Sequence, residues 1–127
     1  MRVINVFRKA IHCNREDKPV KTLNIKYNIS FDNPEILDKK SEVGKLNLKV
    51  NVDYISDKES IGNIEGEWII LLKYEKDDKI NKKDDLLKNV DKVLPNIWTK
   101  IVMDLISYAN LVNLPPPLRL PRLRVEK

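Results

Sequence analysis

Two stretches of the chain alternate strictly between apolar and polar residues. In KLNLKVNVDY the apolar side chains fall at every second position, namely Leu46, Leu48, Val50, Val52 and Tyr54. TLNIKYNISF repeats the pattern with Leu23, Ile25, Tyr27, Ile29 and Phe31. Strict alternation predicts antiparallel strands with one face in water. Asn33 and Pro34 are expected to end the second of these stretches.

Two further stretches are apolar on both sides. In IEGEWIILLKY one face holds Ile64, Trp68, Ile70, Leu72 and Tyr74, while the opposite face starts with Glu65 and Glu67 and turns apolar at Ile69 and Leu71. The other stretch is VINVFRKAIHC, near the N-terminus. It is expected to place Val3, Phe7, Ile11 and Cys13 on one side and Ile4, Val6 and Ala10 on the other. A sheet covered by helices on one face does not need apolar residues on both sides. A second layer or a partner is therefore expected to cover them.

The period becomes helical after the hydrophilic segment EKDDKINKKDD. DLLKNVDKV predicts a short helix, and Pro95 suits the first turn of a long one over PNIWTKIVMDLISYANLV. The apolar residues of the long helix cover about half its circumference, wider than the ~100° stripe of a helix lying on one sheet. They are Leu94, Ile97, Trp98, Ile101, Val102, Leu105, Ile106, Tyr108, Ala109 and Val112. This width predicts burial against two surfaces, its own sheet and a helix of another subunit.

These elements predict an α+β fold, in which a four-stranded antiparallel sheet is followed by a short and a long helix packed on one face. A single domain spans residues 1–127, with strands within about 2–75, helices within about 84–112 and a proline-rich connector over 113–127. The prolines of NLPPPLRLPRLRVEK exclude helix and central strand, so the connector is expected to be extended.

Composition narrows the functional classes. Hydrophobic residues make up 42% and charged residues 34%, and the net charge is +5. Basic and acidic residues are interleaved, which is typical of a solvated surface rather than a phosphate track. Only in the C-terminal tail do basic residues outnumber acidic ones, at Arg119, Arg122 and Arg124. A small basic nucleic-acid-binding protein therefore remains an alternative. No signal sequence or membrane span is evident, and a cytoplasmic protein without membrane insertion is expected.

Residues for chemistry are scarce. His12 and Cys13 are the only His and Cys, and neighbours on a strand point to opposite faces, so they cannot form a catalytic pair or a zinc site. The three glycines follow no phosphate-binding pattern. We expect no catalytic residue, no metal, no cofactor and no enzymatic activity.

The C-terminal third carries a resemblance. LPNIWTKIVMDLISYANLVNLPPPLRLP resembles the long helix of SecB-family export chaperones, with its Pro-Asn-Ile start and its connector of alternating leucines and prolines. Leu114, Pro116, Leu118, Leu120 and Pro121 match that connector in kind and spacing. The resemblance extends to SecB relatives that serve toxin–antitoxin systems. The strands expected in this chain match those of the family in number and order.

The resemblance implies an ATP-independent holdase for unfolded or precursor polypeptides, assembled as a homotetramer that is a dimer of dimers. One open alternative is a dedicated chaperone of a single partner such as an antitoxin. The family's second long helix, which would follow the connector, is expected to be missing or reduced. FRKAIHCN lacks the acidic residues that help dock the motor ATPase SecA, which argues against handover of clients to SecA.

Seven residues are candidates for client binding: Leu114, Leu118, Leu120, Trp98, Tyr108, Ile69 and Leu71. For the three leucines the alternative is that they staple the connector to the sheet. Trp98 and Tyr108 could instead be core residues. Ile69 and Leu71 could equally form a subunit interface.

Overall fold

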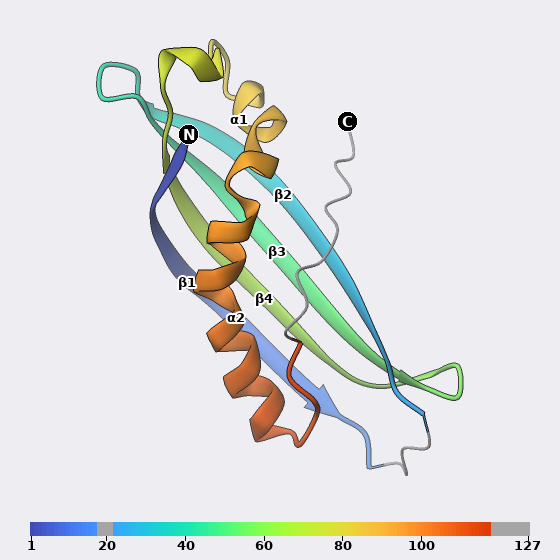
Figure 1. The fold of residues 1–127 in the computed structure, drawn as a ribbon. Helices are drawn as coiled ribbons and strands as arrows, with labels where there is room; N and C mark the ends of the chain where they lie inside the picture. Colours follow the sequence, from blue (N-terminus) through green and yellow to red (C-terminus); the bar gives the residue numbers. More distant parts are fainter. Residues whose placement is uncertain (18–21, 118–127) are drawn as a thin grey trace.

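The computed structural model describes residues 1–17 and 22–117. Its sheet has four antiparallel strands, in the order β1-β4-β3-β2 (Figure 1). The strands are β1 (Arg2–Arg15), β2 (Asn24–Asp38), β3 (Val43–Ser56) and β4 (Glu59–Lys73). Because consecutive strands β2, β3 and β4 are neighbours, hairpins connect them, and the turn between β3 and β4 has only two residues, Asp57 and Lys58. Both have positive φ, 50° and 68°, as the twist of a two-residue hairpin requires.

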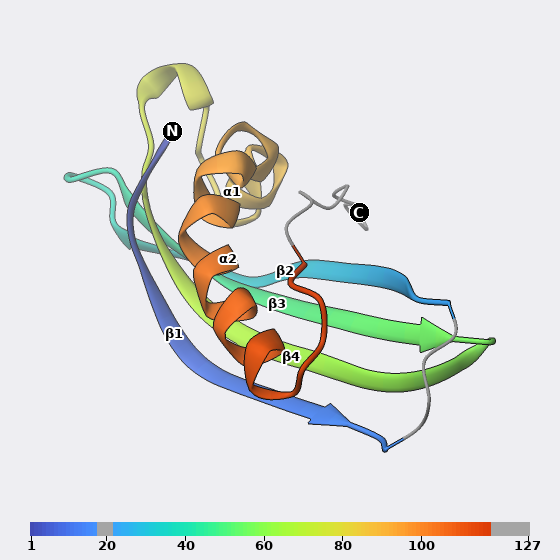
Figure 2. The same cartoon turned by 60° about the horizontal axis from the view of Figure 1, so that its bottom comes forward.

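Helical segments follow the sheet in sequence. They are η1 (Lys76–Asp78), α1 (Asp84–Lys88), η2 (Val90–Lys92) and α2 (Leu94–Leu111). Figure 2 shows α2 lying on one face of the sheet, with the opposite face left uncovered by the described elements. The predicted fold class is therefore confirmed, although the short helix is divided into α1 and η2. No helix in the described ranges is long and apolar enough to cross a bilayer.

The core lies between α2 and the covered face of the sheet. The alternating apolar residues of β3 are fully buried there, from Leu46 to Tyr54, as are Trp68, Ile70 and Leu72 of β4. The helix contributes Leu94, Ile97, Trp98, Ile101, Leu105 and Ala109. The prediction for these faces is confirmed, because both elements keep an unbroken period over their length.

The predicted faces of β1 were wrong at two positions. The pairing of β1 with β4 shifts between Val3 and Asn5 and again between Arg8 and Ala10. Each shift is a β-bulge, which inserts one extra residue and reverses the faces that follow it. Val6 consequently lies opposite the buried Ile70, whereas Phe7 lies opposite Ile69 on the open face.

The predicted end of β2 was also wrong. Asn33 and Pro34 form an irregularity within the strand, which continues to Asp38. Asn33 takes a left-handed conformation with φ 49°. Because β2 is at the edge of the sheet, the missing N–H of Pro34 can be tolerated at such a bulge.

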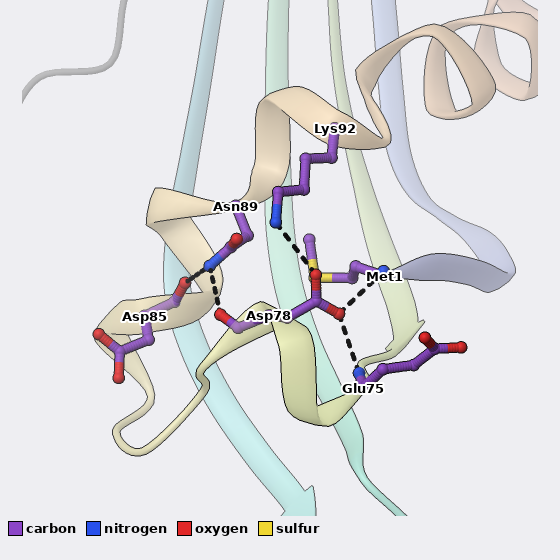
Figure 3. Close-up of polar contacts among 6 residues, drawn as sticks. All are labelled: Met1, Glu75, Asp78, Asp85, Asn89 and Lys92. Carbon is purple, nitrogen blue, oxygen red and sulfur yellow. Dashed lines mark hydrogen bonds and ion pairs between the residues drawn. The ribbon is translucent and has the colours of Figure 1, made fainter.

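One corner of the molecule is fastened by a buried carboxylate, Asp78, which is 7% exposed. Its oxygens accept hydrogen bonds from the Met1 amino group at 2.8 Å, the Glu75 N–H at 2.9 Å and the Lys92 ammonium at 3.1 Å (Figure 3). Burial raises the pKa of Asp78, but these hydrogen bonds and the nearby Met1 charge outweigh it and hold the pKa at about 2. The charged carboxylate thus joins the start of β1 to η1 and η2.

Candidate functional site

The predicted client residues of α2 lie at the two flanks of the helix. Trp98 is 5% exposed and meets the Tyr27 ring of β2 edge to face, with centroids 6.0 Å apart. Such a contact, with the burial, matches the core interpretation of Trp98. Its indole Nε1 has no hydrogen-bond partner among the described residues.

Tyr108 is only partly buried and lies on the side of α2 that faces β1. The Arg8 guanidinium lies 5.9 Å from the centre of its ring, within cation–π range. Arg8 also approaches Asp104 of α2 at 3.4 Å, and the second oxygen of Asp104 accepts a hydrogen bond from the buried Trp68 indole at 3.1 Å. Asp104 therefore fixes α2 to both β4 and β1, and Tyr108 beside it is partly exposed.

The start of the proline-rich connector is attached to the sheet. Leu114 is 4% exposed and lies over Gly62, where a Cβ added to the glycine would come within 3.0 Å of the leucine Cδ1. The Tyr54 hydroxyl donates to the Pro115 carbonyl at 2.6 Å, and Arg15 donates to the Val112 and Asn113 carbonyls at 3.0 and 2.7 Å. Burial raises the pKa of Tyr54 to about 12, so the phenol stays a donor well above neutral pH. The stapling alternative thus describes the placement of Leu114, while Leu118 and Leu120 lie outside the described residues.

Ile69 and Leu71 lie on the open face of β4, and each is partly exposed. The register places Phe7 opposite Ile69 and Asn5 opposite Leu71. Phe7 is 47% exposed, and Ile4, the extra residue of the first bulge, is 48% exposed. We call Ile4, Phe7, Ile69 and Leu71 the β1–β4 patch. Sequence reasoning missed Phe7 as a member because the alternation had no visible break at the bulges.

Most of the other residues on the open face near the middle of the sheet are polar or charged. Next to the β1–β4 patch, Glu67 pairs with Lys9 at 3.6 Å and with Lys49 at 3.7 Å, and Lys49 also reaches Asp32 at 3.4 Å. Beyond this row a shallow depression of about 390 Å³ is lined by His12, Glu65 and Asn51, among others. The open face thus divides into an apolar end and a polar end.

The described residues offer little for bond-making chemistry. His12 lines the polar depression, whereas Cys13 pairs with Ile64 on the covered face, so the two side chains diverge as predicted. Within residues 1–17 and 22–117, no group of His, Cys, Asp or Glu could hold a metal ion. The open face instead exposes apolar area at the β1–β4 patch.

The fold has a counterpart among solved structures. A Mycobacterium tuberculosis SecB-like chaperone, solved in complex with a ChAD peptide from the HigA1 antitoxin, matches with a TM-score of 0.64 at 9% sequence identity. The match covers 98% of this chain and 91% of that chain. No family model and no curated protein sequence matches this chain. The structural likeness confirms the SecB-like fold that the helix, the connector and the strand order predicted.

Proposed function

We propose that this SecB-like chain is an ATP-independent holdase, which binds unfolded polypeptides on apolar surface without carrying out a reaction. The observation that supports it is the β1–β4 patch on an uncovered sheet face. An exposed Phe7 beside Ile69 and Leu71 costs solvation free energy unless something covers it. A client chain of any sequence that buries apolar side chains there would gain ~25 cal/mol per Å².

The proposed client surface has two parts. The β1–β4 patch is one, and the connector leucines Leu118 and Leu120 are the other, as the sequence predicted. Tyr108 is accessible enough to take part, whereas Trp98 and Leu114 would need the helix or the connector to move before a client reached them.

The test is suppression of aggregation of a heat-unfolded protein at stoichiometric chaperone, without nucleotide. We expect wild type to suppress it and Phe7→Ser/Ile69→Ser to do so more weakly, with client affinity lowered by ~2–4 kcal/mol in total. His12→Ser/Asn14→Ser, on the same strand and face, is the matched control and should act like wild type. If wild type leaves aggregation unchanged, the holdase proposal is wrong.

A parallel variant separates the two parts of the surface. Leu118→Ser/Leu120→Ser changes the connector and leaves the β1–β4 patch intact. If this variant alone loses activity while Phe7→Ser/Ile69→Ser keeps it, clients bind at the connector and the patch serves another contact.

A dedicated chaperone of one antitoxin is the second candidate, supported by the antitoxin peptide bound to the M. tuberculosis protein of the same fold. It predicts one tight client and indifference to unrelated unfolded proteins. A panel of unrelated unfolded substrates in the same assay distinguishes the two, because a general holdase suppresses the aggregation of all of them. Export, a cytoplasmic location and the absence of enzymatic activity belong to the general proposal and stay predictions.

A further inference from the structure

A second depression lies at the end of the sheet opposite the β3–β4 turn. Its volume is about 530 Å³, and its walls are the turn between β2 and β3 and the segment that leaves β4. In Figure 1 these segments, teal and yellow-green, lie at the same end of the molecule. Four lysines line it, Lys39 and Lys40 from one wall and Lys76 and Lys79 from the other.

The lysines give the depression an excess of positive charge. Glu42 and Glu75 are the acids among its lining residues, and the charge of Asp38 at the start of the β2–β3 turn also acts on Tyr74, so the four lysines outnumber these three acids by one. Among the described residues none of the four lysines forms an ion pair, whereas Lys45 and Lys49 on the open sheet face and Lys92 at the Asp78 corner are paired. Unpaired lysines on two facing walls attract an anionic ligand.

Backbone contacts fix the two walls relative to each other. The Tyr74 N–H donates to the Glu42 carbonyl at 3.0 Å, which ties the end of β4 to the turn. The Lys79 N–H donates to the Lys76 carbonyl at 3.1 Å, with Lys79 in the left-handed conformation at φ 55°. The backbone positions of the lysines are therefore fixed before a ligand binds.

The residues that line the depression favour a polypeptide over a nucleic acid as its ligand. Ile36 and Ile80 supply partly buried aliphatic surface beside the lysines. Tyr74, the aromatic residue of the lining, is only 5% exposed, so it offers no ring face on which a base could stack. A peptide that carries both carboxylates and apolar side chains would match both the lysines and the aliphatic surface of the depression.

We infer that this lysine-lined depression binds an acidic segment of a client polypeptide. The inference rests on the proposed holdase function and adds a preference, namely for clients whose apolar stretch is followed or preceded by acidic residues. Exposed lysine–carboxylate pairs contribute little singly, and several together are expected to improve affinity by about tenfold at low salt.

The experiment compares three labelled peptides by fluorescence anisotropy with the full chain. The first joins an aromatic and aliphatic segment to a run of glutamates, the second has glutamines in place of the glutamates, and the third is the glutamate run alone. Wild type should bind the first about tenfold more tightly than the second at ~50 mM salt, and the ratio should approach one at ~500 mM.

Two variants locate the effect. Lys40→Gln/Lys76→Gln removes one lysine from each wall and should lower the tenfold ratio to about threefold or less. Lys26→Gln/Lys58→Gln removes the same charge from the opposite end of the sheet and should leave the ratio unchanged. Equal affinity of wild type for the first two peptides overturns the inference, and so does an equal loss of the ratio in both variants.

Failure of the proposed function gives a different result. If wild type does not bind the glutamine peptide at all, the apolar holdase surface is wrong, yet the glutamate run still tests the depression on its own. Binding of that run, lost in Lys40→Gln/Lys76→Gln, supports the depression. A competition experiment completes the test, with a single-stranded oligonucleotide and the unlabelled acidic peptide each used to displace the labelled glutamate run. If the oligonucleotide displaces the run at a lower concentration than the acidic peptide does, the depression is a nucleic-acid site and the inference is overturned.

Discussion

Asp78 shows how much one buried residue can contribute when its partners come from distant parts of the chain. Three donors, the Met1 amino group, the Glu75 N–H and the Lys92 ammonium, converge on its carboxylate. A lone buried carboxylate would be destabilising, and these donors reverse the balance.

Asp78→Asn should lower the free energy of unfolding by ~2 kcal/mol at pH 7. A pKa of about 2 in the folded protein, against 3.8 in the unfolded chain, corresponds to a stabilisation of this size. Because the folded pKa is the lower one, the stabilisation is complete above pH 4 and is lost as the pH falls towards 2. Urea unfolding measures this. The difference in the free energy of unfolding between wild type and variant should be smaller at pH 2 than at pH 7.

The control for this prediction is Asp77→Asn, which removes the exposed carboxylate next to Asp78 in η1. It should change stability by less than ~0.5 kcal/mol. An Asp78→Asn protein as stable as wild type at pH 7 would mean that the three contacts give no net stabilisation.

Gly66 is a second residue whose identity follows from one neighbour. An added Cβ would lie 2.2 Å from Cη2 of Trp68, whose ring is buried over it. Gly66→Ala should cost ~1–3 kcal/mol by overpacking, measured by urea unfolding. In a Trp68→Leu background the same change should cost much less, and an undiminished cost there would locate the strain elsewhere.

At the scale of elements, the attachment of α2 to the sheet depends on Asp104. Two contacts meet there, the half-exposed ion pair with Arg8 and the hydrogen bond from the buried Trp68 indole. An exposed ion pair contributes ~0.2–1 kcal/mol, while a buried donor left without an acceptor costs ~1–3 kcal/mol. The indole contact should therefore dominate.

Asp104→Asn keeps a carbonyl acceptor for the Trp68 indole and removes the charge, so it should cost less than ~1 kcal/mol. Asp104→Ala removes both contacts and should cost ~2 kcal/mol or more. Thermal unfolding of the two variants measures the difference. Equal losses would show that the Arg8 pair, and not the indole contact, holds the helix.

At the scale of the whole molecule, the described chain leaves apolar surface on both sides of its core. Besides the β1–β4 patch, α2 leaves Met103 63% and Leu111 73% exposed, and its Val102 and Ile106 are only half-buried. Val102 and Ile106 belong to the wide apolar arc of the helix, and Met103 lies one turn from Ile106, so the sheet does not cover this side of the arc completely. The exposed apolar area supports the tetramer as a proposal, with helices of several subunits packed between sheets.

Light scattering should give a mass near four times 14.9 kDa, or at least twice that value. Met103→Glu should reduce the mass by placing a charge in the helix–helix contact, without loss of the fold because Met103 is exposed in the single chain. Met103→Leu, apolar at the same site, should keep the wild-type mass. A wild type of 14.9 kDa at micromolar concentration would rule out the tetramer.

The sequence by itself determined the elements and their order. Alternation over Leu46–Tyr54 and a helical period over Leu94–Val112 are local signals, which set the buried face of each element wherever the period is unbroken. The order of the elements predicted an α+β fold, and the resemblance of the Pro-Asn-Ile start and the leucine-rich connector to SecB-family chaperones predicted that it is SecB-like. Ile69 and Leu71 could be recognised as unusual from their face of the strand alone.

Only the tertiary structure decided the surface that the chain presents. Two bulges in β1 moved Phe7 to the open face, since a bulge depends on pairing with β4 and leaves no mark in a short apolar run. Leu114 became a core residue because Gly62 of β4 leaves room for it. The partners of Asp78 and the four lysines of the depression come from segments far apart in sequence. Such contacts depend on how packed elements meet, which no local period encodes.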